Sequence, residues 1–266
     1  CHYTTVVEKI AFISDIHGNL PALKAVFAAG RKQGCSLFFC CGDSVGLGPE
    51  PNGVLDLLQD HRVPTVRGNV DWNVARIVKR QERYLRKGKF EKYISYGHTW
   101  SMLSEENRHY LASLPSSLHL EVAGKVIHLV HALPDDDDGG LTRSLAKREG
   151  SSMLRQFGCD IFATGHTHRP FVVEKKGGLL LNCGSVGAAG LQPLAAQYVV
   201  VSWAHGEALQ GEVHSVPYDS CALHKAFGRS GLPDEMARAF CEGRPLTWKE
   251  RFNLAASCKG DKFRVG

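Results

Sequence analysis

The distribution of hydrophobic residues along the chain predicts an alternation of strands and helices. Residues 9–14 and 37–41 are short apolar runs without polar alternation, which is typical of buried strands. Apolar side chains recur between these runs at helical spacing, at Leu20, Leu23, Val26 and Phe27. Asn19 is a suitable N-cap for this helix, and Gly34 is a plausible end. The strand–helix–strand order predicts a parallel βαβ unit.

The rest of the chain contains further candidate elements. Strands are predicted at residues 63–66, 118–122, 125–131, 159–164, 171–174, 179–182, 197–203 and 209–217, and helices at 54–61 and 144–157. Residues 72–114 break the alternation and are predicted to be mainly helical. We find no internal repeat and no low-complexity linker. We therefore expect one domain over residues 1–266, with a helical insert at about 72–114. The tail at about 219–266 is expected to form two short helices around Gly231-Leu232-Pro233.

Residues of the metal-ligand type follow five of the strand-like runs. They are Asp15, His17, Asp43, Asn69, His131, His166 and His168. Taken singly, each has an ordinary explanation as a helix cap, a turn residue or a loop residue. Ligands of open α/β sheets bind beyond the carboxyl ends of the strands, so we expect these segments to meet in one site. The recurrence of the pattern favours a two-metal hydrolase.

The mixture of ligand types indicates which ions the site would prefer. Carboxylate and amide oxygens combined with imidazoles suit Mn, Fe or Zn, and Ni or Co are further candidates. An aspartate can bridge two ions that lie ~3.5–4 Å apart. Such a pair activates a shared water and stabilises phosphate oxygens during in-line attack, so no serine or cysteine nucleophile is required.

Composition and charge narrow the classes of protein. The chain has 266 residues, of which 43% are hydrophobic and 22% are charged, and these values are typical of a globular protein. The net charge of +5 suits an anionic substrate but disfavours a nucleic-acid partner, which usually requires a denser basic patch. The sequence shows no apolar span of ~18–20 residues and no signal-peptide pattern. The nine cysteines form no CxxC pair, so we expect reduced, mostly buried thiols in a cytoplasmic protein without a membrane partner.

Five motifs together carry a resemblance to a known family. They are Ser-Asp-Ile-His-Gly-Asn at 14–19, Gly-Asp-Ser-Val-Gly-Leu-Gly-Pro at 42–49, Arg-Gly-Asn-Val-Asp at 67–71, Gly-His-Thr-His-Arg-Pro at 165–170 and Asn-Cys-Gly-Ser-Val-Gly at 182–187. In these motifs the chain resembles the calcineurin-like metallophosphoesterases, and within them the small prokaryotic phosphodiesterase branch.

The resemblance implies an α/β fold, a four-layer α/β/β/α sandwich, with a dinuclear site at the carboxyl ends of the strands and a helical cap. It implies two sets of ligands. Asp15, His17 and His168 would hold the first metal, and Asn69, His131 and His166 the second, with Asp43 as the bridge. Asp43, Asn69 and His131 would act directly in catalysis, and Asn69 would also contact the substrate.

One motif departs from the family pattern. The third motif often contains Gly-Asn-His-Asp, where the histidine protonates the leaving group or binds the phosphate. Val70 occupies that position here and has no proton to give. The departure predicts weak turnover of substrates whose leaving group needs an acid.

Two charged segments allow more than one interpretation. Arg80 and Arg83, within the basic run at 76–92, are candidate substrate-binding residues, and His98 is a further candidate. The ordinary alternative for the basic run is a solvated helix face with interspersed acids. Asp135–Asp138 could bind a cation or could form a solvated acidic loop.

The sequence thus predicts a divalent-metal phosphoesterase that prefers phosphodiesters, with a phosphorylated small molecule or nucleotide as substrate. Two alternatives within the class are a dinucleoside polyphosphate hydrolase and a phosphomonoesterase. The alternative outside the class is a non-catalytic metal-binding scaffold, as in a related subunit of the retromer coat. The sequence leaves homo-oligomer formation open.

Overall fold

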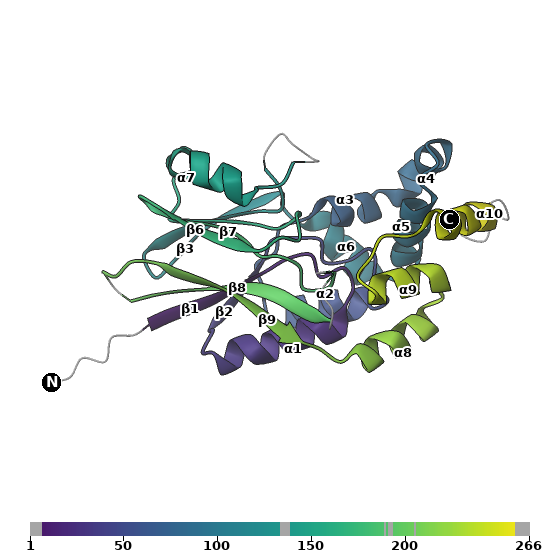
Figure 1. The fold of residues 1–266 in the computed structure, drawn as a ribbon, viewed down its shortest axis with the longest axis horizontal. Coiled ribbons are helices and arrows are strands. Elements are labelled where there is room, and N and C mark those ends of the chain that lie inside the picture. The colour runs from purple at the N-terminus through teal and green to yellow at the C-terminus, as the bar shows by residue number, and fades with distance from the viewer. Residues whose placement is uncertain (1–6, 134–138, 189, 191–193, 205, 259–266) are drawn as a thin grey trace.

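The secondary structure is arranged in four layers (Figure 1). The computed structural model describes residues 7–133, 139–188, 190, 194–204 and 206–258. Helix α7 (Arg143–Phe157) covers the outer face of one sheet, and helices α1 (Leu20–Lys32) and α2 (Pro51–Asp60) cover the outer face of the other. The predicted α/β/β/α sandwich is therefore confirmed.

The first sheet has the strand order β2-β1-β8-β9. Its strands are β1 (Val7–Ile13), β2 (Leu37–Cys40), β8 (Ala195–Ala204) and β9 (Gln210–Pro217). The strands β1 and β2 are parallel and α1 joins them, which is the predicted βαβ unit. The side chain of Asn19 caps α1 by accepting a hydrogen bond from the backbone N–H of Ala22 at 3.1 Å.

The second sheet has the order β3-β4-β5-β7-β6. Its strands are β3 (Ser117–Val122), β4 (Lys125–Val130), β5 (Ile161–Thr164), β6 (Phe171–Lys175) and β7 (Gly178–Asn182). The predicted hairpin β3–β4 turns at Ala123 and Gly124, whose φ angles are 47° and 73°. The three strands β4, β5 and β7 are parallel, so their carboxyl ends share one edge.

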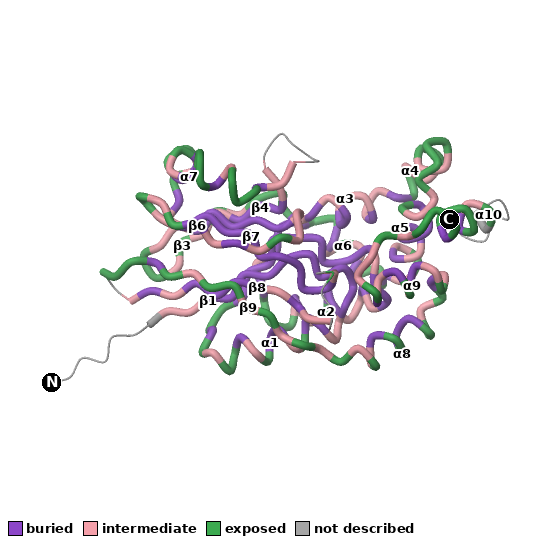
Figure 2. Tube along the Cα trace, in the orientation of Figure 1, coloured by how far each residue is buried: buried purple, intermediate pink, exposed green. Residues whose placement is uncertain are grey.

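Alternation along the strands divides the core between the layers. Ile10 and Phe12 of β1 point into the space between the two sheets, whereas Ala11 and Ile13 pack against helices α1 and α2. All four side chains are fully buried. Figure 2 shows the buried residues concentrated in the two sheets, and exposed residues on the outer faces of the helices.

Helices that are not part of the sandwich gather beyond the carboxyl ends of β1, β2, β4 and β5 (Figure 1). They are α3 (Asn69–Ala75), α4 (Ile77–Arg86), α5 (Phe90–Met102), α6 (Glu105–Ser113), α8 (Ser220–Ser230), α9 (Asp234–Cys241) and α10 (Trp248–Cys258). The first four occupy most of the segment predicted as an insert, and α3 begins already at Asn69.

Two predicted elements are wrong. Residues 63–66 form a single bridge between Cys40 and Thr65 instead of a strand. Pro64 lacks the N–H that a longer ladder would need. The tail contains a third helix, α10, in addition to the two expected. Thr247 and Glu250 cap α10 reciprocally, since the Thr247 N–H donates to Glu250 Oε2 at 2.7 Å and the Glu250 N–H donates to Thr247 Oγ1 at 3.3 Å.

A glycine substitution tests how tightly the loop after β2 is packed. Gly42 has φ +94°, and a Cβ there would lie 2.5 Å from the backbone nitrogen of Gly68. Gly124 has φ +73°, and nothing lies within 4 Å of a Cβ there. We expect Gly42→Ala to lower the free energy of unfolding by several kcal/mol, and Gly124→Ala by only about 1 kcal/mol. Chemical denaturation measures both free energies of unfolding. Equal losses in the two variants would contradict the close packing of Gly42 against Gly68.

Candidate metal centre

The candidate ligands lie in loops that follow strands of both sheets. Asp15 and His17 follow β1, and Asp43 follows β2. His131 directly follows β4, and His166 and His168 follow β5. Asn69 is different, because it begins helix α3. The structure brings all seven together at the end of the sandwich where these strands terminate.

Backbone hydrogen bonds hold these loops against one another. The loop after β1 donates from the N–H groups of Asp15 and His17 to the carbonyls of Gly42 and Asp43, both at 2.9 Å. The N–H of Gly165 donates to the carbonyl of His131 at 3.0 Å. The positions of the side chains therefore depend on contacts between loops that are distant in sequence.

The backbone conformation at the site is unusual. Five of the candidate ligands have positive φ angles, which are 53° for Asp15, 50° for His17, 53° for Asp43, 71° for His166 and 56° for His168. Non-glycine residues rarely adopt this left-handed region, and such residues concentrate at functional sites. This observation is independent of the residue types and supports a functional role for the same loops.

The first group of ligand atoms comes from Asp15, His17 and His168. The distance from His168 Nε2 to Asp15 Oδ1 is 3.1 Å, and that from His17 Nε2 to His168 Nε2 is 3.3 Å. Asp15 and His17 are fully or almost fully buried. The other carboxylate oxygen of Asp15 accepts a hydrogen bond from the N–H of His166 at 2.9 Å. One carboxylate oxygen and two imidazole nitrogens thus converge on one point.

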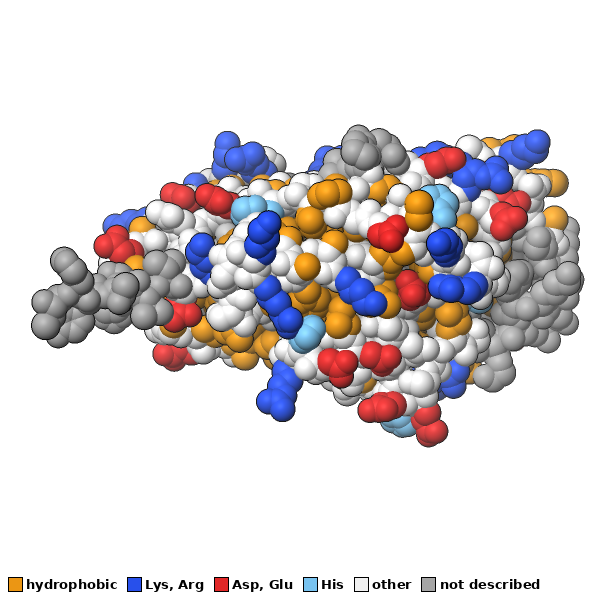
Figure 3. Space-filling model, turned by 90° about the horizontal axis from the view of Figure 1, so that it is seen from below, with side chains coloured by type: hydrophobic (Ala, Val, Ile, Leu, Met, Phe, Trp, Pro, Cys, Tyr) orange, Lys and Arg blue, Asp and Glu red, His pale blue; other side chains and the backbone are white. Residues whose placement is uncertain are grey.

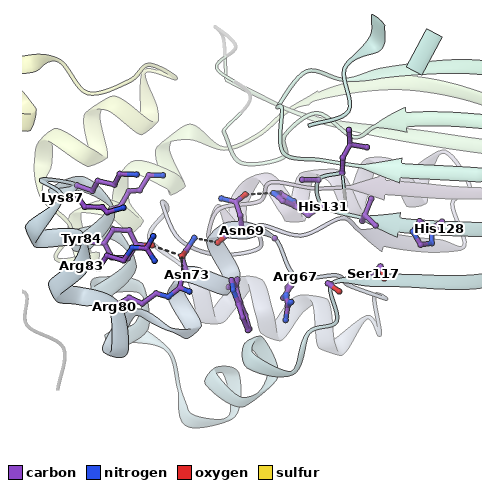
Figure 4. A pocket seen from close by; sticks show the side chains of 18 of the residues that line it. Arg67, Asn69, Asn73, Arg80, Arg83, Tyr84, Lys87, Ser117, His128 and His131 are labelled. Carbon is purple, nitrogen blue, oxygen red and sulfur yellow. Dashed lines mark hydrogen bonds between the residues drawn. The ribbon is translucent and has the colours of Figure 1, made fainter. Parts of the chain in front are cut away.

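The second group comes from Asn69, His131 and His166. Asn69 Oδ1 lies 3.0 Å from His131 Nε2 and 3.0 Å from His166 Nδ1. Figure 4 shows Asn69 and His131 pointing toward each other from different elements. Asp43 Oδ2 lies 3.4 Å from His131 Nε2. Ligand atoms of Asp15, Asp43 and His131 lie within 4.8 Å of one another, so a carboxylate of Asp43 lies between the two groups.

Two of the four imidazoles are oriented for metal binding by carbonyl groups behind them. His131 Nδ1 lies 2.8 Å from the carbonyl of Cys41, and His168 Nδ1 lies 3.0 Å from the carbonyl of Ala188. A carbonyl only accepts, so each Nδ1 carries a hydrogen, and Nε2 is the atom of each ring left to bind a metal once it has lost its own proton.

The charges of the site also fit a cation. Burial raises the pKa of Asp15, but the hydrogen bond from His168 and the nearby imidazoles hold that pKa below its ordinary value. Burial lowers the pKa of His131, but the Asp43 carboxylate raises it to about 10. Two buried carboxylates therefore require positive charge beside them, and a divalent ion would supply it in place of the imidazole protons.

Two cavities open on these ligands. The first, of about 660 Å³, is lined by Asn69 and His131 at one end and by Arg80 and Arg83 of α4 at the other. The second, of about 400 Å³, is lined by five candidate ligands, which are His17, Asp43, Asn69, His166 and His168. The predicted substrate-binding residues Arg80 and Arg83 thus face a cavity that contains two of the predicted ligands.

A chain of hydrogen bonds connects this basic end to the centre (Figure 4). The Tyr84 hydroxyl donates to Asn73 Oδ1 at 2.8 Å, and Arg80 Nη1 donates to the same oxygen at 3.3 Å. The side-chain amide of Asn73 donates to the backbone carbonyl of Asn69 at 2.6 Å. The position of Asn69 is therefore coupled to residues of α4.

Two expectations have a different outcome. His98 lies in α5 and lines neither cavity, because its ring faces the turn at Gly231. The position of His98 thus gives no support to its predicted contact with substrate. Asp135–Asp138 lies outside the described residues.

Sequence reasoning missed other residues near the centre. Asp71 is buried and accepts hydrogen bonds from the N–H groups of Val45 at 3.1 Å and Gly68 at 2.9 Å. Its place at the third position of α3 was the available signal. Tyr96 and the C-terminal residues Met236 and Phe240 line the second cavity. These three are brought there by tertiary contacts, for which the sequence carries no local signal.

Comparisons with known proteins identify the family of the chain. Residues 9–206 match the family model of the calcineurin-like phosphoesterase superfamily domain. An uncharacterized protein from Methanocaldococcus jannaschii is 34% identical over 183 residues, covering 68% of this chain and 71% of the relative. A hypothetical protein from Pyrococcus horikoshii has a similar structure, with a TM-score of 0.73, 20% identity and coverage of 89% of this chain and 99% of that one.

A metallophosphoesterase from Sphaerobacter thermophilus has a TM-score of 0.68 at 22% identity, over 90% of this chain and 100% of that one. At these identities the two structures show only the fold. The family model, which matches most of the chain, shows the family. The chain belongs to the calcineurin-like phosphoesterase superfamily, a class of metal-dependent phosphoester hydrolases.

Two remaining expectations concern the molecule as a whole. No helix in the described part of the chain is long and apolar enough to cross a membrane. None of the seven cysteines from Cys35 to Cys241 forms a disulfide, and six of them are buried while Cys221 is exposed. The prediction of mostly buried free thiols is confirmed for these residues.

The position of Asp43 between the two groups yields a test of metal stoichiometry. We expect about two Mn²⁺ per chain by elemental analysis of the reconstituted protein, and about one or fewer in Asp43→Asn, because the amide is a poor bridge. Asp219→Asn, which changes an exposed cap of α8, is the matched control and should leave the metal content unchanged. Two ions in Asp43→Asn would show that Asp43 does not join the sites.

Proposed function

We propose that the protein is a dinuclear, divalent-metal phosphodiesterase. The observation that supports this proposal most strongly is the arrangement of seven ligands in two groups with the Asp43 carboxylate between them. Bound ions would supply an activated water and would stabilise the phosphate oxygens. In this account Asp15, His17 and His168 hold one ion, and Asn69, His131 and His166 hold the other.

The protein itself contributes rigidity and positive charge. Two carbonyl groups fix the rings of His131 and His168, so little reorganisation is needed when ions and substrate bind. Asp43 is held from the opposite side, because its Oδ1 accepts a hydrogen bond from the N–H of Val70 at 2.8 Å. Arg80 and Arg83 provide charge that can orient an anionic substrate.

The residue at position 70 supports a preference for diesters. Val70 is buried beside the candidate ligands and lines the second cavity. It offers no proton to a leaving group and no positive charge to the second negative charge of a monoester. Tyr96 lines the same cavity, and burial together with the Asp43 charge raises the pKa of its hydroxyl. Tyr96 therefore stays protonated but is a weak acid, so it can assist only leaving groups that already depart easily.

Hydrolysis of dinucleoside polyphosphates is the second candidate. The cations of the first cavity favour it, because a polyphosphate chain would place several charges there. Its leaving group is also acidic and needs little help. The scaffold alternative has less support, since the ligand set is complete and two of its imidazoles are oriented for binding by backbone carbonyls.

Position 70 provides the test of substrate class. We expect the metal-loaded protein to hydrolyse bis(4-nitrophenyl) phosphate with a higher kcat/KM than 4-nitrophenyl phosphate. Val70→His should raise monoester turnover selectively, by roughly 10²-fold, because it adds a positioned acid. The measurement is kcat/KM for both esters in both proteins with the same metal.

Val70→Thr serves as the control, because threonine keeps the branched shape without an imidazole. It should leave the ratio of the two esters unchanged. A wild-type preference for the monoester, or an equal effect of histidine on both esters, would contradict the proposed role of position 70.

A further inference from the structure

The two cavities meet at the candidate metal centre but differ in chemistry. Asn69 and Lys92 line both cavities. A phosphorus atom bound at the centre would therefore have one ester group directed toward each cavity. The chemistry of each cavity then indicates what that ester group is.

The first cavity is strongly basic. Among the described residues, its lining contains six cations, which are Arg67, Arg80, Arg83, Lys87, Lys89 and Lys92, and no aspartate or glutamate. None of the six forms an ion pair within the described residues. By contrast, the face shown in Figure 3 carries basic and acidic side chains intermingled. The cavity thus gathers six cations around one space, where an anionic group would find several partners.

The second cavity is largely apolar. Leu47, Val70, Met236, Phe240 and Leu246 contribute much of its lining. Two arginines also line it, but both already have carboxylate partners. Arg244 Nη2 lies 2.8 Å from Glu250 Oε1, and Arg251 Nη1 lies 3.4 Å from Glu91 Oε2. This cavity thus offers apolar surface with little unpaired charge besides that of Lys92.

The C-terminal helices form one wall of the second cavity. Met236 and Phe240 come from α9, and Leu246 precedes α10. This wall is fixed to helix α5, because Met236 and Leu254 pack with Tyr93 of α5 in one buried cluster. Figure 1 shows α10 beside α5, in agreement with that cluster. The tail therefore forms part of the lining of the second cavity.

Resting on the proposed phosphodiesterase activity, we propose that the substrate is an asymmetric phosphodiester with one apolar ester group and one ester group that carries a further phosphate. The apolar group occupies the second cavity, against Phe240 and Leu47, and the phosphorylated group occupies the first, against Arg83 and Lys87. Hydrolysis replaces one P–O ester bond by a bond to the oxygen of water, and the released alcohol takes a proton. The products are an alcohol and a phosphomonoester.

Binding of non-hydrolysable analogues tests this assignment without any requirement for turnover. The probes are four phosphinates with CH₂ in place of both ester oxygens. They combine a methyl or benzyl group on one side with an ethyl or 2-phosphoethyl group on the other. Calorimetry with the Mn²⁺-loaded protein should give about tenfold tighter binding for benzyl over methyl. It should also give roughly tenfold tighter binding for phosphoethyl over ethyl.

Variants should remove the two preferences separately. Phe240→Ala should abolish the benzyl preference and keep the phosphate preference. The double variant Arg83→Ala/Lys87→Ala should do the reverse. Leu47→Ala tests the same apolar wall from the loop after β2 if Phe240→Ala fails to fold.

The matched controls are Phe252→Ala on α10 and Lys79→Ala/Arg86→Ala on α4, which alter exposed residues that line neither cavity. They should preserve both preferences. Added salt should reduce only the phosphate preference.

Two results would overturn the assignment. One is equal binding of benzyl and methyl, or of phosphoethyl and ethyl, to the wild-type protein. The other is a benzyl preference that survives both Phe240→Ala and Leu47→Ala, or a phosphate preference that survives the double variant. Failure to hydrolyse any diester would contradict the proposed function alone, because the analogues measure binding. Turnover of diesters without either binding preference would contradict this inference alone.

Discussion

The organisation of the site depends on the buried residue Asp15, where loops from both sheets meet. Its N–H donates to the carbonyl of Gly42 at 2.9 Å, and its carbonyl accepts from the N–H of Gly187 at 2.9 Å. Its carboxylate accepts from the N–H of His166 at 2.9 Å and lies 3.1 Å from His168 Nε2. One residue thus ties the loop after β1 to the loops after β2, β5 and β7. A buried carboxylate is stable only with such partners, so the same contacts define both the fold at this edge and the electrostatics of the centre.

The layered fold explains how residues so distant in sequence can be placed so accurately. Apart from Asn69, the ligands lie in loops that follow strands of the core, and in β1 Phe12 packs between the sheets and Ile13 against the helices. Small residues then allow close approach of the loops. A Cβ at Gly68 would lie 1.9 Å from Asp43 Oδ1, and one at Gly165 would lie 1.9 Å from Ser14 Oγ. The geometry of the candidate centre is therefore a consequence of close packing between loops.

Much of the sandwich could be predicted because its signals are local. The apolar run that became β1, the cap at Asn19 and the turn at Ala123-Gly124 each depend on a few neighbouring residues. The failures have physical reasons. Residues 63–66 resemble a strand in composition, but Pro64 limits the pairing to one bridge. The third tail helix depends on a cap between Thr247 and Glu250, a local signal that the hydrophobic pattern alone does not reveal.

The site also has one part that the sequence reveals and one part that it does not. The candidate ligands are recognisable because they stand in short sequence motifs, and all except Asn69 follow a strand. The walls of the cavities are not recognisable in this way, since Tyr96 and Phe240 reach the centre only through packing of the helices. In the proposed function, this is the part of the molecule that would distinguish substrates.

The central claim is that seven side chains hold two adjacent ions, with Asp43 between them. Anomalous diffraction at the manganese edge from crystals of the Mn²⁺-loaded protein measures this directly. The account predicts two peaks about 3.5–4 Å apart. One peak should lie beside Asp15, His17 and His168, the other beside Asn69, His131 and His166, and Asp43 should contact both. A single peak, or ions bound away from these residues, would contradict it.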